Sequence, residues 1–246
     1  MPGVVILKNI SKSFSVDISR PSTYTVIKNL FSRNGHYSRS FNALKDINVE
    51  IERGESVGLI GNNGAGKTTL LKTIAGLYRP DNGEVVINGE VNFLAGFGIG
   101  MVDELSVTEN IYLYGAIYGM DRNKIHQNFD DIVEWAELQN FTGAKLKTLS
   151  TGMRTRLAFS VTRFIAADIY LLDEALSAGD KSFRQKCEMV FESYKPDKKT
   201  LIISTHNMEF VKKFCTKTLW LHKGVLMDFG DTETVLKKYL EMKNNN

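Results

Sequence analysis

A glycine-rich segment, Gly61–Thr69, constrains the fold of this chain more than any other feature. It follows a short apolar run, Ser56–Ile60, and leads into a predicted helix, Thr68–Leu77. The pattern GxxxxGK[ST] between a strand and a helix is typical of a loop that binds phosphates. Glycines let backbone N–H groups approach the phosphates, and the positive end of the helix dipole attracts them. The sequence therefore predicts an α/β fold built around a phosphate-binding loop.

The whole segment is a candidate nucleotide site, made of Gly61, Asn62, Asn63, Gly64, Ala65, Gly66, Lys67, Thr68 and Thr69. We expect Lys67 to reach the β- and γ-phosphates as a point charge. We expect the Thr68 hydroxyl to bind Mg²⁺. ATP and Mg²⁺ are therefore the predicted cofactors.

Three further side chains follow predicted strands and suit hydrolysis. Asp173 ends the apolar strand Ile169–Leu172, where it can hold the Mg²⁺ shell through water. Glu174 comes next and can polarise an attacking water as general base. His206 follows the strand Leu201–Ser204 and, as a neutral imidazole, could contact the γ-phosphate. The alternatives are a structural Asp-Glu pair at a strand end and a structural histidine.

A second candidate anion site lies at Ser150–Gly152, before a helix predicted at Arg154–Ala166. Ser150 can cap that helix, and Gly152 lets the backbone come close to a ligand. Because the chain already has one phosphate loop, we expect this second site to hold the γ-phosphate of a nucleotide bound by another copy. The alternative is an ordinary helix start.

The composition narrows the class of protein. The chain has 246 residues, 43% of them apolar, which suits one sizeable domain. Its formal charge of +3 argues against general nucleic-acid binding. Cys187 and Cys215 are isolated, so we expect reduced packing residues. No signal peptide and no apolar run of ~20 residues is evident, so another chain would have to supply any path across a membrane.

Outside these motifs, the patterns of apolar residues predict further elements. Strands are expected at Val4–Asn9, Leu44–Ile51, Glu84–Asn88, Thr200–Ser204, Lys217–His222 and Val225–Phe229, and helices at Val107–Gly119, Asn123–Ala136, Phe183–Phe191 and Glu233–Met242. We expect a single domain over residues 1–246. Its nucleotide-binding core would span about 1–91 and 161–246, with a helical subdomain at 92–160.

An irregular segment is predicted at 15–42. No acidic residue lies between Asp17 and Asp46, whereas the segment 15–42 contains the basic residues Arg20, Lys28, Arg33, His36 and Arg39. One interpretation is a solvated loop. The other is a basic surface facing lipid headgroups, where each Lys or Arg contributes about 1 kcal/mol.

Taken in order, these motifs resemble the ATP-binding subunits of ABC transporters over nearly the whole chain. The resemblance identifies Gly61–Thr69 as Walker A, Leu149–Met153 as the signature and Ile169–Asp173 as Walker B. Ser177–Asp180 is similar to the D-loop, and His206 to the switch histidine. It implies a P-loop core with an antiparallel β lobe and an inserted helical lobe. It also implies an ATP-dependent head-to-tail homodimer that drives separate transmembrane permease subunits.

Departures from the usual pattern resemble one branch of that family. The signature reads LSTGM, and no glutamine lies between Lys67 and Gln127. The loop Leu94–Gly98 stands in its place, followed by Glu109–Ile111 and, after the signature, by Met153–Phe159. These features are similar to ATPases that export O-antigen, capsule or teichoic-acid polysaccharides. They imply peripheral attachment to the cytoplasmic face of the bacterial inner membrane, and we expect Leu94–Gly98 to contact the permease.

Several alternatives remain at this stage. The aromatic residue on adenine is expected to be Phe14, with Tyr37 and Phe41 as alternatives because the 15–42 segment moves the register. The chain is too short for the C-terminal carbohydrate-binding domain of some O-antigen exporters. Other functions are export of a lipid or small molecule, and a soluble ABC ATPase, which would usually carry tandem cassettes or a long coiled coil. A P-loop kinase would lack the signature and the switch histidine.

Overall fold

The computed structural model describes residues 3–17, 38–94, 98, 100–173 and 181–244 of the chain. The predictions for Tyr37, Phe97, Glu174, Ser177–Asp180 and the centre of the 15–42 segment fall outside these residues.

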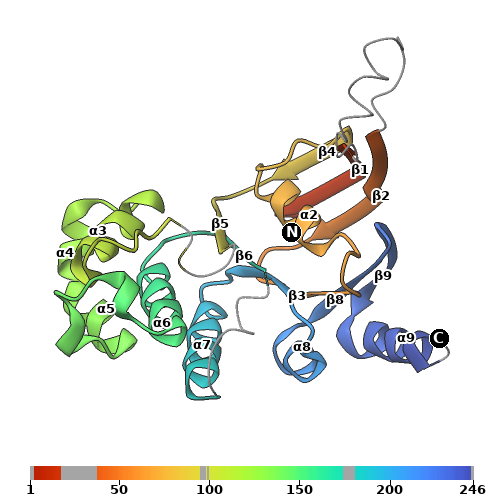
Figure 1. Ribbon diagram of the computed structural model, residues 1–246. Helices are drawn as coiled ribbons and strands as arrows, with labels where there is room; N and C mark the ends of the chain where they lie inside the picture. Colours follow the sequence, from red (N-terminus) through yellow and green to blue (C-terminus); the bar gives the residue numbers. More distant parts are fainter. Residues whose placement is uncertain (1–2, 18–37, 95–97, 99, 174–180, 245–246) are drawn as a thin grey trace, which may run out of the picture.

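An antiparallel sheet forms the N-terminal lobe (Figure 1). Its strand order is β2-β1-β4, with β1 at Val5–Asp17, β2 at Ser38–Ile51 and β4 at Asn82–Ile87. The prediction of an irregular segment over all of 15–42 is wrong at both ends, because residues 15–17 pair with 38–40 in a continuation of β1 and β2. One face of an antiparallel pair of strands can be exposed to water and carry polar side chains. These polar residues made the ends of the two strands look irregular in the sequence.

A six-stranded sheet forms the centre of the molecule, in the order β5-β6-β7-β3-β8-β9 (Figure 1). The strands are β3 (Ser56–Ile60), β5 (Val91–Leu94), β6 (Ile169–Asp173), β7 (Thr200–Ser204), β8 (Lys217–His222) and β9 (Val225–Asp231). All are parallel except β9, which forms the predicted hairpin with β8. β3 lies between β7 and β8 and is buried along its whole length, as expected for a central parallel strand.

Helices cover this sheet, and one of them, α2, packs between it and the antiparallel lobe. α2 (Lys67–Ile74) packs its apolar side chains into the core shared by the two sheets. α7 (Lys181–Tyr194) and α8 (Met208–Phe214) contribute to a second core with β6 and β7. α9 (Thr232–Asn244) packs against β8. Cys187 and Cys215 are buried free thiols, as the sequence predicted.

A block of helices with its own apolar core lies beside the sheet, at the left of Figure 1. It contains α3 (Val107–Ile117), α4 (Arg122–Gln127), α5 (Phe129–Ala136) and α6 (Thr151–Thr162), with 3₁₀ turns η1 (Gln139–Phe141) and η2 (Leu146–Thr148). The single helix predicted at Asn123–Ala136 is wrong. Asn128 leaves the helical conformation, and its side chain donates to the Lys124 carbonyl oxygen over 2.7 Å, which ends α4.

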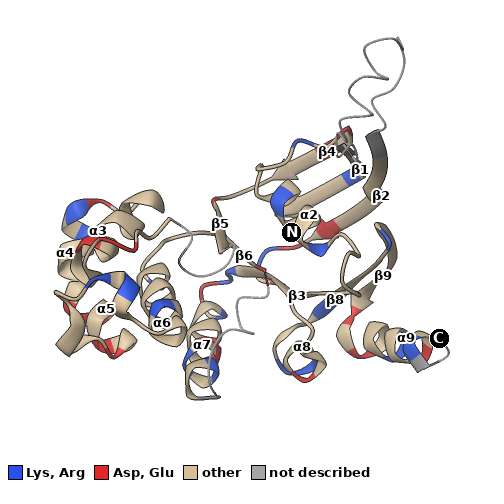
Figure 2. Cartoon of the chain, viewed as in Figure 1, with Lys and Arg blue, Asp and Glu red and all other residues tan. Residues whose placement is uncertain are grey.

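The predicted α/β fold with an antiparallel β lobe and a helical block is confirmed. Two elements, β5 and α8, were missed, and β5 carries the central sheet past residue 92 to Leu94. Lys and Arg are interspersed with Asp and Glu on α7, α8 and α9 (Figure 2). Among the described residues, no helix combines the length and apolar character needed to cross a bilayer.

Candidate nucleotide-binding site

The predicted phosphate loop connects the buried strand β3 to the helix α2. Gly61 has φ 149°, and a Cβ there would lie 2.3 Å from the Leu221 carbonyl oxygen. Gly66 has φ 105°, and its Cβ would lie 2.5 Å from the Ala43 carbonyl oxygen. Gly64 has open space around it but a φ of 76°. The first two glycines are therefore required by packing within the chain, and not only by the approach of a ligand.

A cavity of about 690 Å³ lies over this loop. It is lined by Phe41, Asn42, Ala43, Lys45, Asn63, Gly64, Ala65, Gly66, Lys67, Thr68, Thr69 and Lys223. Three of these residues are lysines and none is acidic. Gly66 caps α2 without a side chain, and the first turn of α2 holds no carboxylate. The free N–H groups of a helix start therefore face a cationic cavity, which fits a polyphosphate.

Lys67 is buried and folds back over the loop. Its Nζ donates to the carbonyl oxygen of Gly61 over 3.0 Å and lies 3.4 Å from that of Asn62. His206 Nε2 lies 3.5 Å from the same ammonium. The structure thus brings together the phosphate-loop lysine and the histidine that the sequence singled out 139 residues later.

Strand order explains this convergence. Asp173 at the end of β6 is opposite Ser204 of β7, and Ser204 is opposite Leu59 of β3. Because the strands are parallel, their carboxyl ends meet at one edge of the sheet, where a ligand is usually bound. Asp173 ends β6, His206 comes shortly after β7, and the phosphate loop comes directly after β3, so all three lie at that edge. The Thr68 hydroxyl on the first turn of α2 and the Asp173 carboxylate are oxygen donors of the kind that Mg²⁺ prefers.

The aromatic residue that lines the cavity is Phe41 and not Phe14. Phe14 lies behind it, with ring centroids 5.9 Å apart, and its other face meets the edge of Tyr78 at 5.3 Å. The extended pairing of β1 with β2 places Phe14 opposite Phe41. Phe14, the expected aromatic residue, is not among the described residues that line the cavity, whereas its alternative Phe41 lines it and is half exposed.

The second predicted anion site is separate from this cavity. Ser150 caps α6, and its Oγ accepts from the backbone N–H of Met153 over 3.3 Å, as the sequence predicted. Ser150 and Gly152 are exposed, and neither lines the cavity over the phosphate loop. The chain by itself does not unite the two sites.

The stretch Glu109–Ile111, recognised only by resemblance, has a structural role. Glu109 completes a capping box with Ser106 at the start of α3. The buried Asn110 amide accepts from Val102 N–H over 2.7 Å and donates to backbone carbonyl oxygens of Val102, Leu105 and Ser106. These bonds fix the turn that carries Asp103, which accepts from Arg154 of α6 over 2.6 Å. The stretch therefore holds the segment in front of the α6 N-terminus.

Sequence reasoning missed two cavity residues, Lys45 and Lys223. Lys45 lies on β2, and Lys223 in the turn of the β8–β9 hairpin. The hairpin itself was predicted, but its position over the phosphate loop depends on the pairing of β3 with β8, which no local pattern indicates.

Comparison with known proteins agrees with this site. A family profile described as "ABC transporter" matches residues 44–177. The chain is 35% identical over 240 residues to the teichoic acids export ATP-binding protein TagH of Shouchella clausii, covering 98% of this chain and 66% of that protein. It is 36% identical over 243 residues to the O-antigen export system ATP-binding protein RfbB of Myxococcus xanthus, covering 96% of this chain and 55% of that protein.

Solved structures share the fold. An ATP-binding subunit of an ABC transporter aligns with a TM-score of 0.74 at 20% identity, over 96% of this chain and 93% of the other. A dimeric ATP-binding cassette bound to ADP and Pi aligns with a TM-score of 0.72 at 24% identity, over 93% and 98%. At these identities the likeness is one of fold. Together with the family profile and the relatives in sequence, it places this chain in the ABC transporter family.

Proposed function

We propose that this chain is the ATP-hydrolysing subunit of an ABC transporter that exports a lipid-linked polysaccharide of the O-antigen, capsule or teichoic-acid kind. The observation that carries the ATPase half is the cationic cavity over the phosphate loop, whose Lys67 ammonium lies 3.5 Å from His206 Nε2. The export half rests on the names of the two relatives in sequence, TagH and RfbB, and on the LSTGM signature. The chain spans only 66% and 55% of two of those relatives.

In the nucleotide site, Phe41 stacks on the base and Gly61–Thr69 binds the phosphates. Lys67 exchanges its bonds to the loop carbonyl oxygens for bonds to phosphate oxygens. Thr68 and Asp173 hold Mg²⁺, which supplies charge neutralisation when bound. Glu174 polarises the attacking water, and His206 contacts the γ-phosphate from the neighbouring strand.

The working unit is a head-to-tail dimer of this chain. Ser150 and Gly152 at the exposed start of α6 bind the γ-phosphate of the nucleotide held by the second copy. Support comes from their separation from the cavity within one chain, and the dimeric cassette noted above has the same fold. We assign residues 1–246 to one ATPase domain, in which about 92–160 form the helical subdomain, apart from residues 92–94, which belong to β5 of the central sheet.

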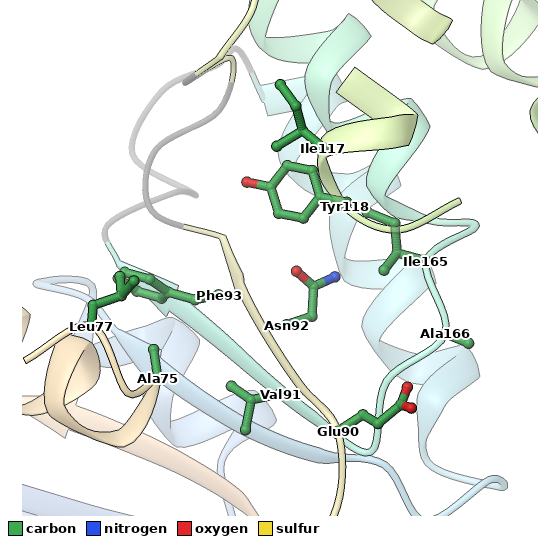
Figure 3. A pocket seen from close by; sticks show the side chains of 10 residues that line it. All are labelled: Ala75, Leu77, Glu90, Val91, Asn92, Phe93, Ile117, Tyr118, Ile165 and Ala166. Atoms are coloured by element: carbon green, nitrogen blue, oxygen red, sulfur yellow. The ribbon is translucent and has the colours of Figure 1, made fainter. Parts of the chain in front are cut away.

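A groove between the core and the helical block supports a permease contact. Figure 3 shows this cavity of about 580 Å³, lined by the end of α2, by β5 and by the end of α3. Leu77 and Ile117 stand at its rim and are 62% and 54% exposed. The Asn92 amide points into it, buried and without a hydrogen-bond partner among the described residues. An apolar rim around an unsatisfied amide fits a protein segment that brings both apolar side chains and polar backbone groups.

The groove is lined by Val91–Phe93 of β5, the strand whose last residue, Leu94, begins the segment predicted to contact the permease. We therefore place the permease, and with it the inner face of the membrane, at this side of the molecule. Phe97→Ala should uncouple export, leaving basal ATPase activity within about twofold of wild type, because the residue is assigned to the permease and not to the nucleotide site. Export and ATPase assays on the complete transporter test this, and unchanged export would contradict it.

The function itself is tested by deleting the gene in its source organism and locating the long glycan. Lipid-linked polymer trapped inside the cell, with none on the surface, is the expected result. Complementation with the wild-type gene, but not with a Lys67→Ala variant, should restore surface glycan. Normal surface glycan in the deletion strain would overturn polysaccharide export and favour the alternative of lipid or small-molecule export.

A further inference from the structure

The turn between β8 and β9 places a lysine at the rim of the nucleotide cavity. Lys223 and Gly224 connect His222 to Val225, which are paired in register. Their φ angles are 48° and 80°, so both residues of this two-residue turn are left-handed. This geometry is that of a type I′ hairpin, whose twist matches the flanking strands.

The turn is fixed against the phosphate loop. Gly224 N–H donates to the Ala65 carbonyl oxygen over 3.0 Å, and Lys45 N–H donates to the Gly224 carbonyl oxygen over 2.8 Å. A Cβ on Gly224 would lie 2.7 Å from the Ala43 carbonyl oxygen. The backbone of Lys223 is therefore held beside the cavity by contacts with both the loop and β2.

Lysine is an unfavourable choice for this turn. The first position of a type I′ turn favours Asn, Asp or Gly, because other side chains are strained at positive φ. At the rim of a cavity lined with other lysines, a residue that opposes its local conformational preference points to a functional side chain.

The surroundings of Lys223 suit an anion. Its side chain is exposed and, within the described residues, forms no ion pair. It lines the cavity together with Lys45 and Lys67, and among the residues that the structure describes no acidic side chain lines it with them. Lys67 already bonds the loop carbonyl oxygens, so Lys223 adds a second source of positive charge from another part of the chain.

We propose that Lys223 is a further nucleotide-binding residue, whose ammonium binds the triphosphate of the ATP held by the phosphate loop. The proposal rests on the proposed function and adds to it a residue outside the recognised motifs.

Lys223→Asn separates the side chain's charge from the turn's conformation. Asparagine accepts positive φ, and Asn-Gly is a preferred type I′ pair, so the thermal unfolding temperature should stay level or rise. ATP affinity, measured by calorimetry on the full chain, should weaken about tenfold, as expected for loss of one charge-assisted hydrogen bond. The loss should shrink as ionic strength rises, because it is electrostatic. Lys223→Arg should retain most of the affinity.

The matched control is Lys198→Asn. Lys198 also has positive φ, 51°, and is exposed, but it lies between α7 and β7 at the opposite edge of the sheet. This variant should bind ATP as wild type does. Equal losses in the two variants would overturn the proposal, and so would wild-type affinity in Lys223→Asn.

Lys67→Ala distinguishes this proposal from the proposed function. If wild type binds ATP and Lys67→Ala loses it, the nucleotide site is established, and the Lys223→Asn result decides the proposal alone. If wild type binds no nucleotide, both fail together.

Discussion

The helices α2 and α6 both begin at a predicted anion site, yet they begin in opposite ways. α2 is capped by Gly66, which has no side chain to satisfy its first N–H groups, and it faces a cavity lined with lysines. α6 is capped by Ser150, whose hydroxyl satisfies the N–H of Met153, and it begins at the exposed surface. The first site is organised within one chain before any ligand binds. The second has a cap whose hydroxyl serves the chain alone, and in the proposed dimer the nucleotide of the second copy completes it.

The glycines of the two sites, Gly66 and Gly152, also differ in how closely the rest of the chain packs around them. Gly66 cannot gain a side chain without meeting the Ala43 carbonyl oxygen. At Gly152 a Cβ would find only the Ser150 Oγ, at 4.0 Å. The fold of one chain therefore explains Gly66 and leaves Gly152 unexplained. In the proposed dimer, the nucleotide of the second copy would lie close to the start of α6 and would account for it.

The largest effect is expected from a substitution that tests both anion sites at once. Glu174→Gln should lower ATP turnover by about 10²- to 10⁴-fold, the usual contribution of a general base. Because ATP is bound and not cleaved, the dimer that brings α2 of one copy to α6 of the other should accumulate. Light scattering with and without ATP measures it. Normal turnover would show that the general base is another residue.

Replacing each of the two glycines by alanine tests the comparison between the two sites directly. Gly66→Ala should lower the free energy of unfolding by about 1–3 kcal/mol, because its φ of 105° and its close contact both oppose a side chain. Gly152→Ala should leave stability unchanged or raise it by up to about 1 kcal/mol, since alanine favours the helix. Urea unfolding measures both.

The same Gly152→Ala change, combined with Glu174→Gln, should prevent the ATP-dependent dimer. A combined variant that dimerises like the single Glu174→Gln protein would remove the reason for assigning Gly152 to the partner's nucleotide.

The smallest effect is on the cap of α6. Ser150→Ala should cost about 1 kcal/mol of stability, the usual value of an N-cap hydroxyl, and should weaken the ATP-dependent dimer. Nucleotide affinity of the monomer should not change. Ser106→Ala is the matched control, because Ser106 caps α3 in the same way. If both variants weaken the dimer equally, the loss comes from helix stability and not from a contact with nucleotide.

The sequence was sufficient for the elements whose patterns are local. Gly61–Thr69 was found because a phosphate loop has a fixed spacing, and β3, β6 and β7 because buried parallel strands are continuous apolar runs. β5 was missed because it is only four residues long and includes the polar Asn92, so its identity as a strand depends on pairing with β6. α8 was missed because seven residues are too few for a clear helical period.

The sequence predicted the site residues that belong to recognised motifs. It did not predict the residues that reach the site only through tertiary contacts. No local sequence pattern distinguishes Phe14 from Phe41 as the residue that lines the cavity. The two are cross-strand partners in the pairing of β1 with β2, and of the two only Phe41 lines it. Lys45 and Lys223 have no motif at all, since they reach the cavity through the sheet order and the hairpin turn.

The position of β3 has a consequence for how this protein is made. The strand that leads into the phosphate loop is completed by residue 60, but its two neighbours are β7 at Thr200–Ser204 and β8 at Lys217–His222. The phosphate loop also lacks one backbone hydrogen bond until Gly224 has been synthesised, because the Gly224 N–H donates to the Ala65 carbonyl oxygen. A chain growing on the ribosome therefore exposes a fully apolar strand during the synthesis of most of its length. The phosphate loop therefore gains its backbone bond to the β8–β9 turn, and its strand gains both neighbours, only after residue 224 has been synthesised.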